Sequence, residues 1–97
     1  MVSLRTTRRS AAWRARSRVF DAEIRRAAAG HEPRFPAYSH FFPSDLVTDE
    51  DIRACHEQGQ AVVIVDEHEH VTVLPAPDPS IAERESDRFW SEIRAQR

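Results

Sequence analysis

The sequence contains one cysteine, two glycines and no lysine, and it has no long apolar run. Because Cys55 has no second cysteine with which to form an internal disulfide, the composition favours a reducing compartment. No apolar stretch reaches the roughly 18 residues of a membrane span, and the N-terminus lacks the continuous apolar segment of a secretory signal. We therefore expect a cytoplasmic protein that makes no contact with a membrane.

Sequence signatures of common enzymes are also missing. The chain has no G-x-S-x-G motif, no phosphate-binding loop and no dinucleotide fingerprint. Cys55 and His56 are adjacent, but neighbours at i and i+1 on a helix point in different directions, so a buried, inert thiol is favoured over a catalytic pair. The sequence thus predicts a protein that is not an enzyme, with no catalytic residue and no cofactor.

The length of 97 residues fits one small domain. A domain of this size buries only about 60 to 65% of the surface of its unfolded chain, and a monomer would be marginally stable. Self-association or a binding partner would add buried surface. We therefore expect a homodimer, a complex with another protein, or both.

Charge is distributed unevenly along the chain. Residues 1–30 contain eight arginines against two acidic residues, whereas residues 31–97 contain six arginines against fourteen. The N-terminal arginines could neutralise phosphates of a nucleic acid, although a solvated helix face or a patch that pairs with the acidic part of the same chain would look alike. The candidate nucleic-acid-binding residues are Arg5, Arg8, Arg9, Arg14, Arg18 and Arg25.

Residues 10–30 have the pattern of an amphipathic helix. Ser10 is suited to the N-cap, and Gly30 stands where a helix usually ends. Trp13, Phe20 and Ile24 recur at helical spacing and predict an apolar stripe, with arginines on the opposite side.

The middle of the chain predicts a small sheet. Residues 38–42 are expected to form a short edge strand, and a capping box at Thr48 opens a helix that Gly59 closes. The β-branched run at 61–65 predicts a buried strand, with 71–74 as its antiparallel partner. The predicted fold class is α+β: a small antiparallel sheet with short helices, and an amphipathic helix at each end.

The link between the last two strands, residues 66–70, is acidic and contains two histidines. His68 and His70 could offer two imidazoles to a metal if they lay on a strand, but no further ligands stand at a recognisable spacing. We therefore favour a solvated hairpin turn and expect no metal.

A second amphipathic helix is expected from Ile81 to about Ala95, opened by a capping box of Ser80 and Glu83. Its apolar stripe is too narrow to bury much surface against the same small chain, so it is a candidate to lie in a groove of another protein. The candidate partner-binding residues are Ile81, Phe89, Trp90 and Ile93.

The stretch "PSDLVTDEDIRACHEQGQAVVIVDEHEHVTVLPAPD" resembles the prevent-host-death (Phd/YefM) antitoxins of bacterial toxin–antitoxin pairs. The family pattern has a Ser-acid-Leu helix start, which residues 44–46 match, and a second helix that ends in glycine, which Gly59 matches. A β-branched strand, a tight turn and a strand closing in Val-x-Val-Leu follow, at residues 62–65 and 71–74.

This resemblance implies a homodimer that represses transcription by binding operator DNA and whose C-terminal segment blocks a toxin, often a ribonuclease. Two features depart from the family. The turn at 66–70 lacks the usual glycine, and residues 1–34 precede the first strand. Either the N-terminal arginines take over the contact with DNA, or DNA binding is lost while the dimer and the partner remain.

The sequence as a whole predicts three parts: a basic extension at 1–34, a dimerisation core at 35–75 and a partner-binding helix at 76–97. We expect an antitoxin-like protein that neutralises a toxin and contacts operator DNA as a dimer. The alternative is a phage- or host-encoded interaction module that inhibits a cellular enzyme without binding DNA. A metal-dependent activity at His68 and His70 ranks last.

Overall fold

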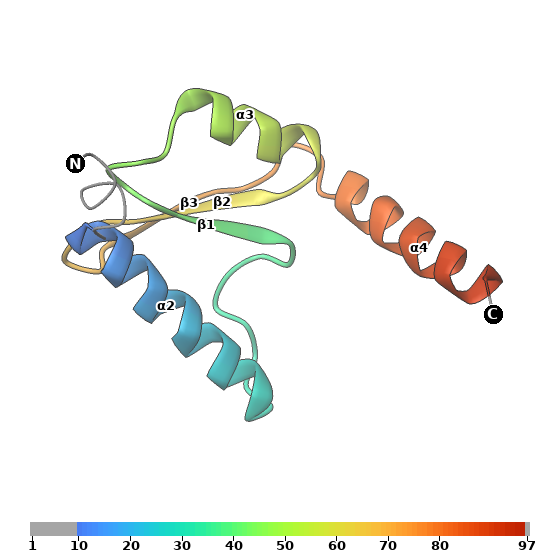
Figure 1. Cartoon of the computed structure of the whole chain (residues 1–97), viewed down its shortest axis with the longest axis horizontal. Coiled ribbons are helices and arrows are strands. Elements are labelled where there is room, and N and C mark those ends of the chain that lie inside the picture. Colours follow the sequence, from blue (N-terminus) through green and yellow to red (C-terminus); the bar gives the residue numbers. More distant parts are fainter. Residues whose placement is uncertain (1–9, 97) are drawn as a thin grey trace, which may run out of the picture.

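The computed structural model describes residues 10–96 and has the predicted α+β class. Its sheet lies between two helices, and a further helix points away from this body (Figure 1). In chain order the elements are α2 (Ala11–Ala28), β1 (Ser39–Pro43), α3 (Asp49–Glu57), β2 (Ala61–Val65), β3 (Val71–Leu74) and α4 (Ser80–Ala95). No helix within this part of the chain is both long enough and apolar enough to cross a membrane.

The sheet is mixed, so the prediction of a wholly antiparallel sheet was wrong. β2 pairs antiparallel with β3, as expected, and places Val63 opposite Val73. β1, however, runs parallel to β2, with Phe41 beside Val63. The physical reason is α3, which returns the chain to the starting end of β1 before β2 begins and so acts as a crossover between parallel strands.

The two faces of the sheet are covered by different helices. Phe41, Val63 and Val65 alternate onto the face that packs against α2, where they form the main core with Ala15 and Val19. The alternate residues of β2 point to the opposite face, which α3 covers. Val62 of the strand and Cys55 of the helix are both buried there. Strand β2 is therefore buried on both sides, in line with its continuous β-branched sequence.

The apolar stripe predicted for α2 only partly matches its buried face. Ala12, Ala15 and Val19 are buried, whereas Ile24 is 52% exposed. Small side chains let the helix axis approach the sheet closely, and Phe20 then fills the flank, with its ring 5.3 Å from that of Phe41 in an edge-to-face arrangement. The N-terminal extension thus contributes a layer of the core.

The predicted helix boundaries agree with the cap chemistry. The Ser10 hydroxyl accepts a hydrogen bond of 2.9 Å from the amide of Trp13. Gly30 adopts a φ of +83°, and its amide donates to Ala27 while the next amide donates to Arg26, which is the Schellman arrangement. For α3, the side chains and backbones of Thr48 and Asp51 form the complete capping box.

Helix α4 begins differently from the prediction. Pro79 occupies the N-cap position and makes no side-chain cap hydrogen bond, and the predicted capping box of Ser80 and Glu83 does not form. The Ser80 hydroxyl instead donates to the Asp78 carboxylate at 2.5 Å, and the Ser80 amide donates to the same oxygen. Asp78 precedes the helix and binds this first amide, which leaves Ser80 inside the helix.

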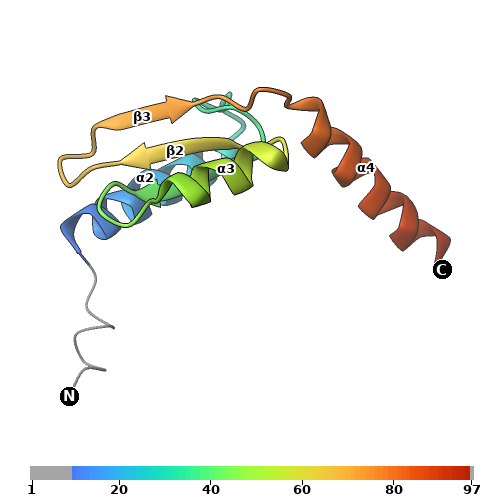
Figure 2. The same cartoon turned by 90° about the horizontal axis from the view of Figure 1, so that it is seen from above.

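The direction of α4 makes the molecule elongated (Figure 2). The radius of gyration is 15.7 Å, whereas a compact chain of this length would have about 12.5 Å. The prolines between β3 and α4 carry the chain away from the sheet edge in an extended form. Most of α4 therefore lies beside solvent instead of beside the core.

Candidate partner-binding surface

Helix α4 is attached to the body at its first turn. Gly59, which ends α3 with a φ of +77°, lies so close to α4 that an added Cβ would stand 2.9 Å from the Cβ of Ile81 and would overlap the amide nitrogen of Ala82. Ala82 itself is buried. Gly59 thus serves both as the left-handed end of α3 and as the seat of α4.

The predicted partner-binding residues differ in exposure. Phe89 is 56% exposed and Trp90 is 54% exposed, and their rings form an edge-to-face pair with centroids 5.4 Å apart. Ile81 and Ile93 are half-buried. The two aromatic residues are therefore the large apolar side chains that α4 leaves in contact with water.

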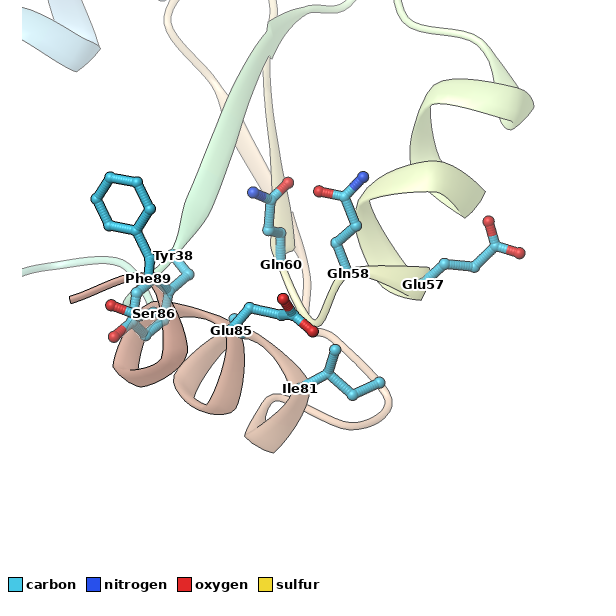
Figure 3. A pocket seen from close by; sticks show the side chains of 9 residues that line it. Tyr38, Glu57, Gln58, Gln60, Ile81, Glu85, Ser86 and Phe89 are labelled. Atoms are coloured by element: carbon cyan, nitrogen blue, oxygen red, sulfur yellow. The ribbon is translucent and has the colours of Figure 1, made fainter. Parts of the chain in front are cut away.

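A cleft with a volume of 440 Å³ separates α4 from the body (Figure 3). Ile81, Glu85 and Phe89 line it from α4, while Gln58 and Gln60 line it from the end of α3 and the start of β2. Tyr38 closes it beside β1 and is 45% exposed. One wall of the cleft is thus formed by the apolar stripe of α4, and the other wall is formed by the body of the protein.

Of the predicted nucleic-acid-binding arginines, the structure describes three, and all three lie on α2. Arg5, Arg8 and Arg9 lie outside the described residues. Arg14 and Arg25 are exposed on α2. Arg18 is exposed as well, but its Nε donates a hydrogen bond of 2.8 Å to the Glu69 carboxylate in the β2–β3 turn.

Other arginines of the first half pair with the chain itself. The Glu23 carboxylate accepts a 2.5 Å hydrogen bond from Arg34 and lies 3.6 Å from Arg26. Burial alone would raise the pKa of Glu23, but the hydrogen bonds and charge of Arg34, with the charge of Arg26, lower the pKa overall. These arginines pin α2 to the loop that follows it.

The link at 66–70 forms a tight turn organised by Asp66. Its carboxylate accepts hydrogen bonds from the amides of His68 at 2.8 Å and His70 at 2.9 Å, and Glu69 takes the left-handed conformation with a φ of +64°. The backbone hydrogen bonds, first that of His70, lower the pKa of Asp66. Among residues 10–96, no three His, Cys, Asp or Glu side chains are grouped so that they could hold a metal ion.

Cys55 and His56 point in different directions, as predicted. Cys55 is buried between α3 and the sheet, where burial, followed by the charge of Asp51, raises the pKa of its thiol. His56 instead lies with its Nε2 3.2 Å from the carbonyl oxygen of Leu74 and ties α3 to β3.

The sequence did not indicate the cleft. Tyr38, Gln58 and Gln60 lie in or beside turns, where no periodic pattern marks a residue as facing a neighbour. The left-handed φ of +57° at Tyr38 likewise has no signal in the residue type.

Comparison with protein-family models, with curated proteins and with solved structures finds no match for the chain.

Proposed function

We propose that this chain is an antitoxin-like protein that binds and neutralises a partner toxin through α4 and contacts operator DNA as a homodimer. The observation that carries the proposal is α4 itself. It holds two half-exposed aromatic side chains, Phe89 and Trp90, on a helix whose first turn is seated against Gly59 and whose remainder points away from the sheet. Exposed aromatic residues on an amphipathic helix are the usual anchors of helix-in-groove binding.

The energetics favour a partner for α4. Most of the helix gains little from the core, and an isolated helix of 16 residues is only marginally stable in water. A groove that covered Phe89 and Trp90 would bury large aromatic surfaces and hold the helix in place. The helix would thereby gain from the partner the stability that its own body does not supply.

The order of elements also supports the proposal. A short strand, a turn that starts at Ser44, a helix that ends at Gly59 and a β2–β3 hairpin follow one another as in the antitoxin family that the sequence resembles. Ser44 begins a single helical turn, in which the amides of Leu46 and Val47 both donate to the carbonyl oxygen of Pro43 at 3.2 Å. The likeness concerns the order of elements and is independent of α4.

The DNA-binding part of the proposal depends on α2. Arg14, Arg18 and Arg25 project from this helix, and the arginines of residues 1–9 precede it in the sequence. In a dimer, two such helices would present two basic surfaces to phosphates. Arg18 would exchange its exposed ion pair with Glu69 for a phosphate contact, at little cost, because a surface ion pair contributes about 0 to 1 kcal/mol.

The same ion pair favours a second candidate function. If Arg18 serves to hold α2 against the β2–β3 turn, the chain is an interaction module, encoded by a phage or its host, that inhibits a cellular enzyme through α4 without binding DNA. Both functions use α4 in the same way. They differ in whether the arginines of α2 contact nucleic acid.

The antitoxin function is tested in cells. The protein encoded beside this chain is expressed alone, where growth arrest is expected, and then together with the chain, where rescue is expected. The double variant F89A/W90A should fail to rescue. Rescue by the double variant, with the partner still toxic alone, would show that α4 is not the anchor.

A further inference from the structure

The cleft beside α4 combines negative charge with aromatic walls. Of its nine lining residues, two are acidic, Glu57 and Glu85, and none is basic. The Glu85 carboxylate has one ion-pair contact within the described chain, at 4.0 Å to the exposed Arg88. At that distance and exposure, the pair neutralises little of the charge.

The apolar part of the cleft is formed mainly by α4. In Figure 3, the Glu85 side chain lies between Ile81 and Phe89, with Gln58 and Gln60 across from the helix. A ligand that reached Glu85 would therefore pass beside the Phe89 ring and beside amide oxygens that can accept hydrogen bonds. Glu57 stands at the far rim, where it adds negative potential without pointing at the same spot.

We propose that this cleft receives an arginine side chain of the protein that binds α4. The guanidinium would form charge-assisted hydrogen bonds with Glu85, and the amide oxygen of Gln58 or Gln60 would accept a further one. Its planar face would stack on Phe89, and its methylene groups would pack on Ile81. This inference rests on the proposed function and names the chemistry that the partner brings to it.

Arginine fits this cleft better than lysine or an apolar side chain. Guanidinium is planar, stacks on aromatic rings and has five donors for several oxygen acceptors at once, whereas ammonium is a compact and strongly hydrated charge. An apolar side chain would bury the Glu85 carboxylate without a partner, which is costly. A partner with an acidic side chain at this position would be repelled by both Glu57 and Glu85.

The experiment uses the full chain and a small probe, so it does not require the partner. The ¹⁵N-labelled protein is titrated with N-acetyl-arginine methylamide, and the amide signals of Gln58, Gln60 and Ser86 are followed. The same titration is repeated with two comparison probes, the neutral isostere N-acetyl-citrulline methylamide and the lysine analogue N-acetyl-lysine methylamide. We expect saturable shifts for the arginine probe, with an affinity about tenfold above that for citrulline, as for the loss of one charged hydrogen bond.

Substitutions locate the site. Glu85→Gln should weaken binding of the arginine probe by about tenfold, since the amide keeps the shape but loses the charge. Asp87→Asn is the matched control, because Asp87 is exposed on the same helix but does not line the cleft. It should leave the affinity unchanged.

The outcomes separate the two proposals. Equal shifts for arginine and citrulline, stronger binding of the lysine probe, or equal effects of Glu85→Gln and Asp87→Asn would overturn the arginine cleft. Arginine binding that is intact in a chain that fails to neutralise its partner would overturn only the antitoxin function. Loss of rescue in F89A/W90A, together with absent probe binding in the unmodified protein, would support α4 as the anchor and reject the cleft.

Discussion

The Nε atom of Arg16 donates a hydrogen bond of 2.9 Å to the carbonyl oxygen of Phe41, although 25 residues separate them in the chain. The same guanidinium lies 5.0 Å from the centroid of the Phe20 ring. Phe41 belongs to β1. On either side of this strand, Tyr38 and Ser44 direct their backbone groups to β2: the Tyr38 carbonyl accepts from Ala61, and the Ser44 amide donates to Val65. Because backbone groups alternate in direction along a strand, the even-numbered residues face β2 and the odd-numbered residues face away from it. The backbone of Phe41 therefore faces the outer edge of the sheet, and α2 satisfies its carbonyl.

Replacement of Arg16 should destabilise the protein. Arg16→Met keeps much of the apolar length but leaves the partly buried carbonyl of Phe41 without its charged donor, so we expect a loss of about 1 to 2 kcal/mol in the free energy of unfolding. Urea denaturation measures this loss. Arg25→Met, on the exposed side of the same helix, is the control and should change stability by less than about 0.5 kcal/mol.

The two glycines allow the docking of α4 to be measured. Both have positive φ, but nothing lies within 4 Å of an added Cβ at Gly30, whereas Gly59 faces α4. Gly30→Ala should cost about 1 to 2 kcal/mol from the left-handed backbone alone. Gly59→Ala should cost the same strain plus the displacement of α4, and urea denaturation of both variants gives the difference. Equal losses would mean that α4 is not seated on Gly59.

The aromatic residues of α4 should matter for binding and not for folding. Both residues are more than half exposed, so F89A/W90A should change the free energy of unfolding by less than about 0.5 kcal/mol but weaken partner binding by at least about 2 kcal/mol. Calorimetric titration with the partner measures the second quantity. Ile24→Ala, which truncates an exposed apolar residue on α2, should leave binding unchanged.

Salt dependence should distinguish the two candidate functions. If α2 contacts DNA, the logarithm of the binding constant should fall linearly with that of the salt concentration, with a slope of about 0.9 per phosphate contact. Replacement of Arg14, Arg18 and Arg25 by glutamine should flatten this slope in mobility-shift titrations. The matched replacement of three arginines on α4 by glutamine, at Arg84, Arg88 and Arg94, should leave the slope unchanged. No DNA complex at low salt would favour the interaction module.

The hairpin turn should lose stability in acid. Asp66 has a pKa below the ordinary value of 3.8 in the folded state, because the amides of His70 and His68 donate to its carboxylate. Since the folded pKa is the lower one, the stabilising effect is complete above 3.8 and is lost as the pH falls through the folded pKa. Asp66→Asn should remove this part of the pH dependence, which amide exchange in the turn would detect. An unchanged acid profile would contradict the role of Asp66.

Local chemistry made the element boundaries predictable. Ser10, Gly30, Thr48 and Gly59 end or begin helices through contacts with residues at most a few positions away, so the sequence pattern contains the necessary information. The capping box predicted at Ser80 failed because Asp78, two residues earlier, offers its carboxylate to the first amide of α4.

Features that depend on distant contacts were not predictable in this way. The direction of β1 follows from the crossover through α3, and residues 38–42 alone are compatible with either pairing. The buried face of α2 consists of small residues, which a search for large apolar side chains overlooks. The cleft combines residues of α4 with residues near β1, α3 and β2, so only the folded chain brings them together.

The two borders of the sheet have unequal capacity to recruit another strand. On the β1 side, Pro43 offers no amide hydrogen, and Arg16 occupies the Phe41 carbonyl, so that border is closed to lateral growth. β3 forms the opposite border, and no further strand within residues 10–96 pairs with it. Joining through β3 would consume the single open border of each molecule. Association along the sheet would then stop at two copies and could not continue into a fibril.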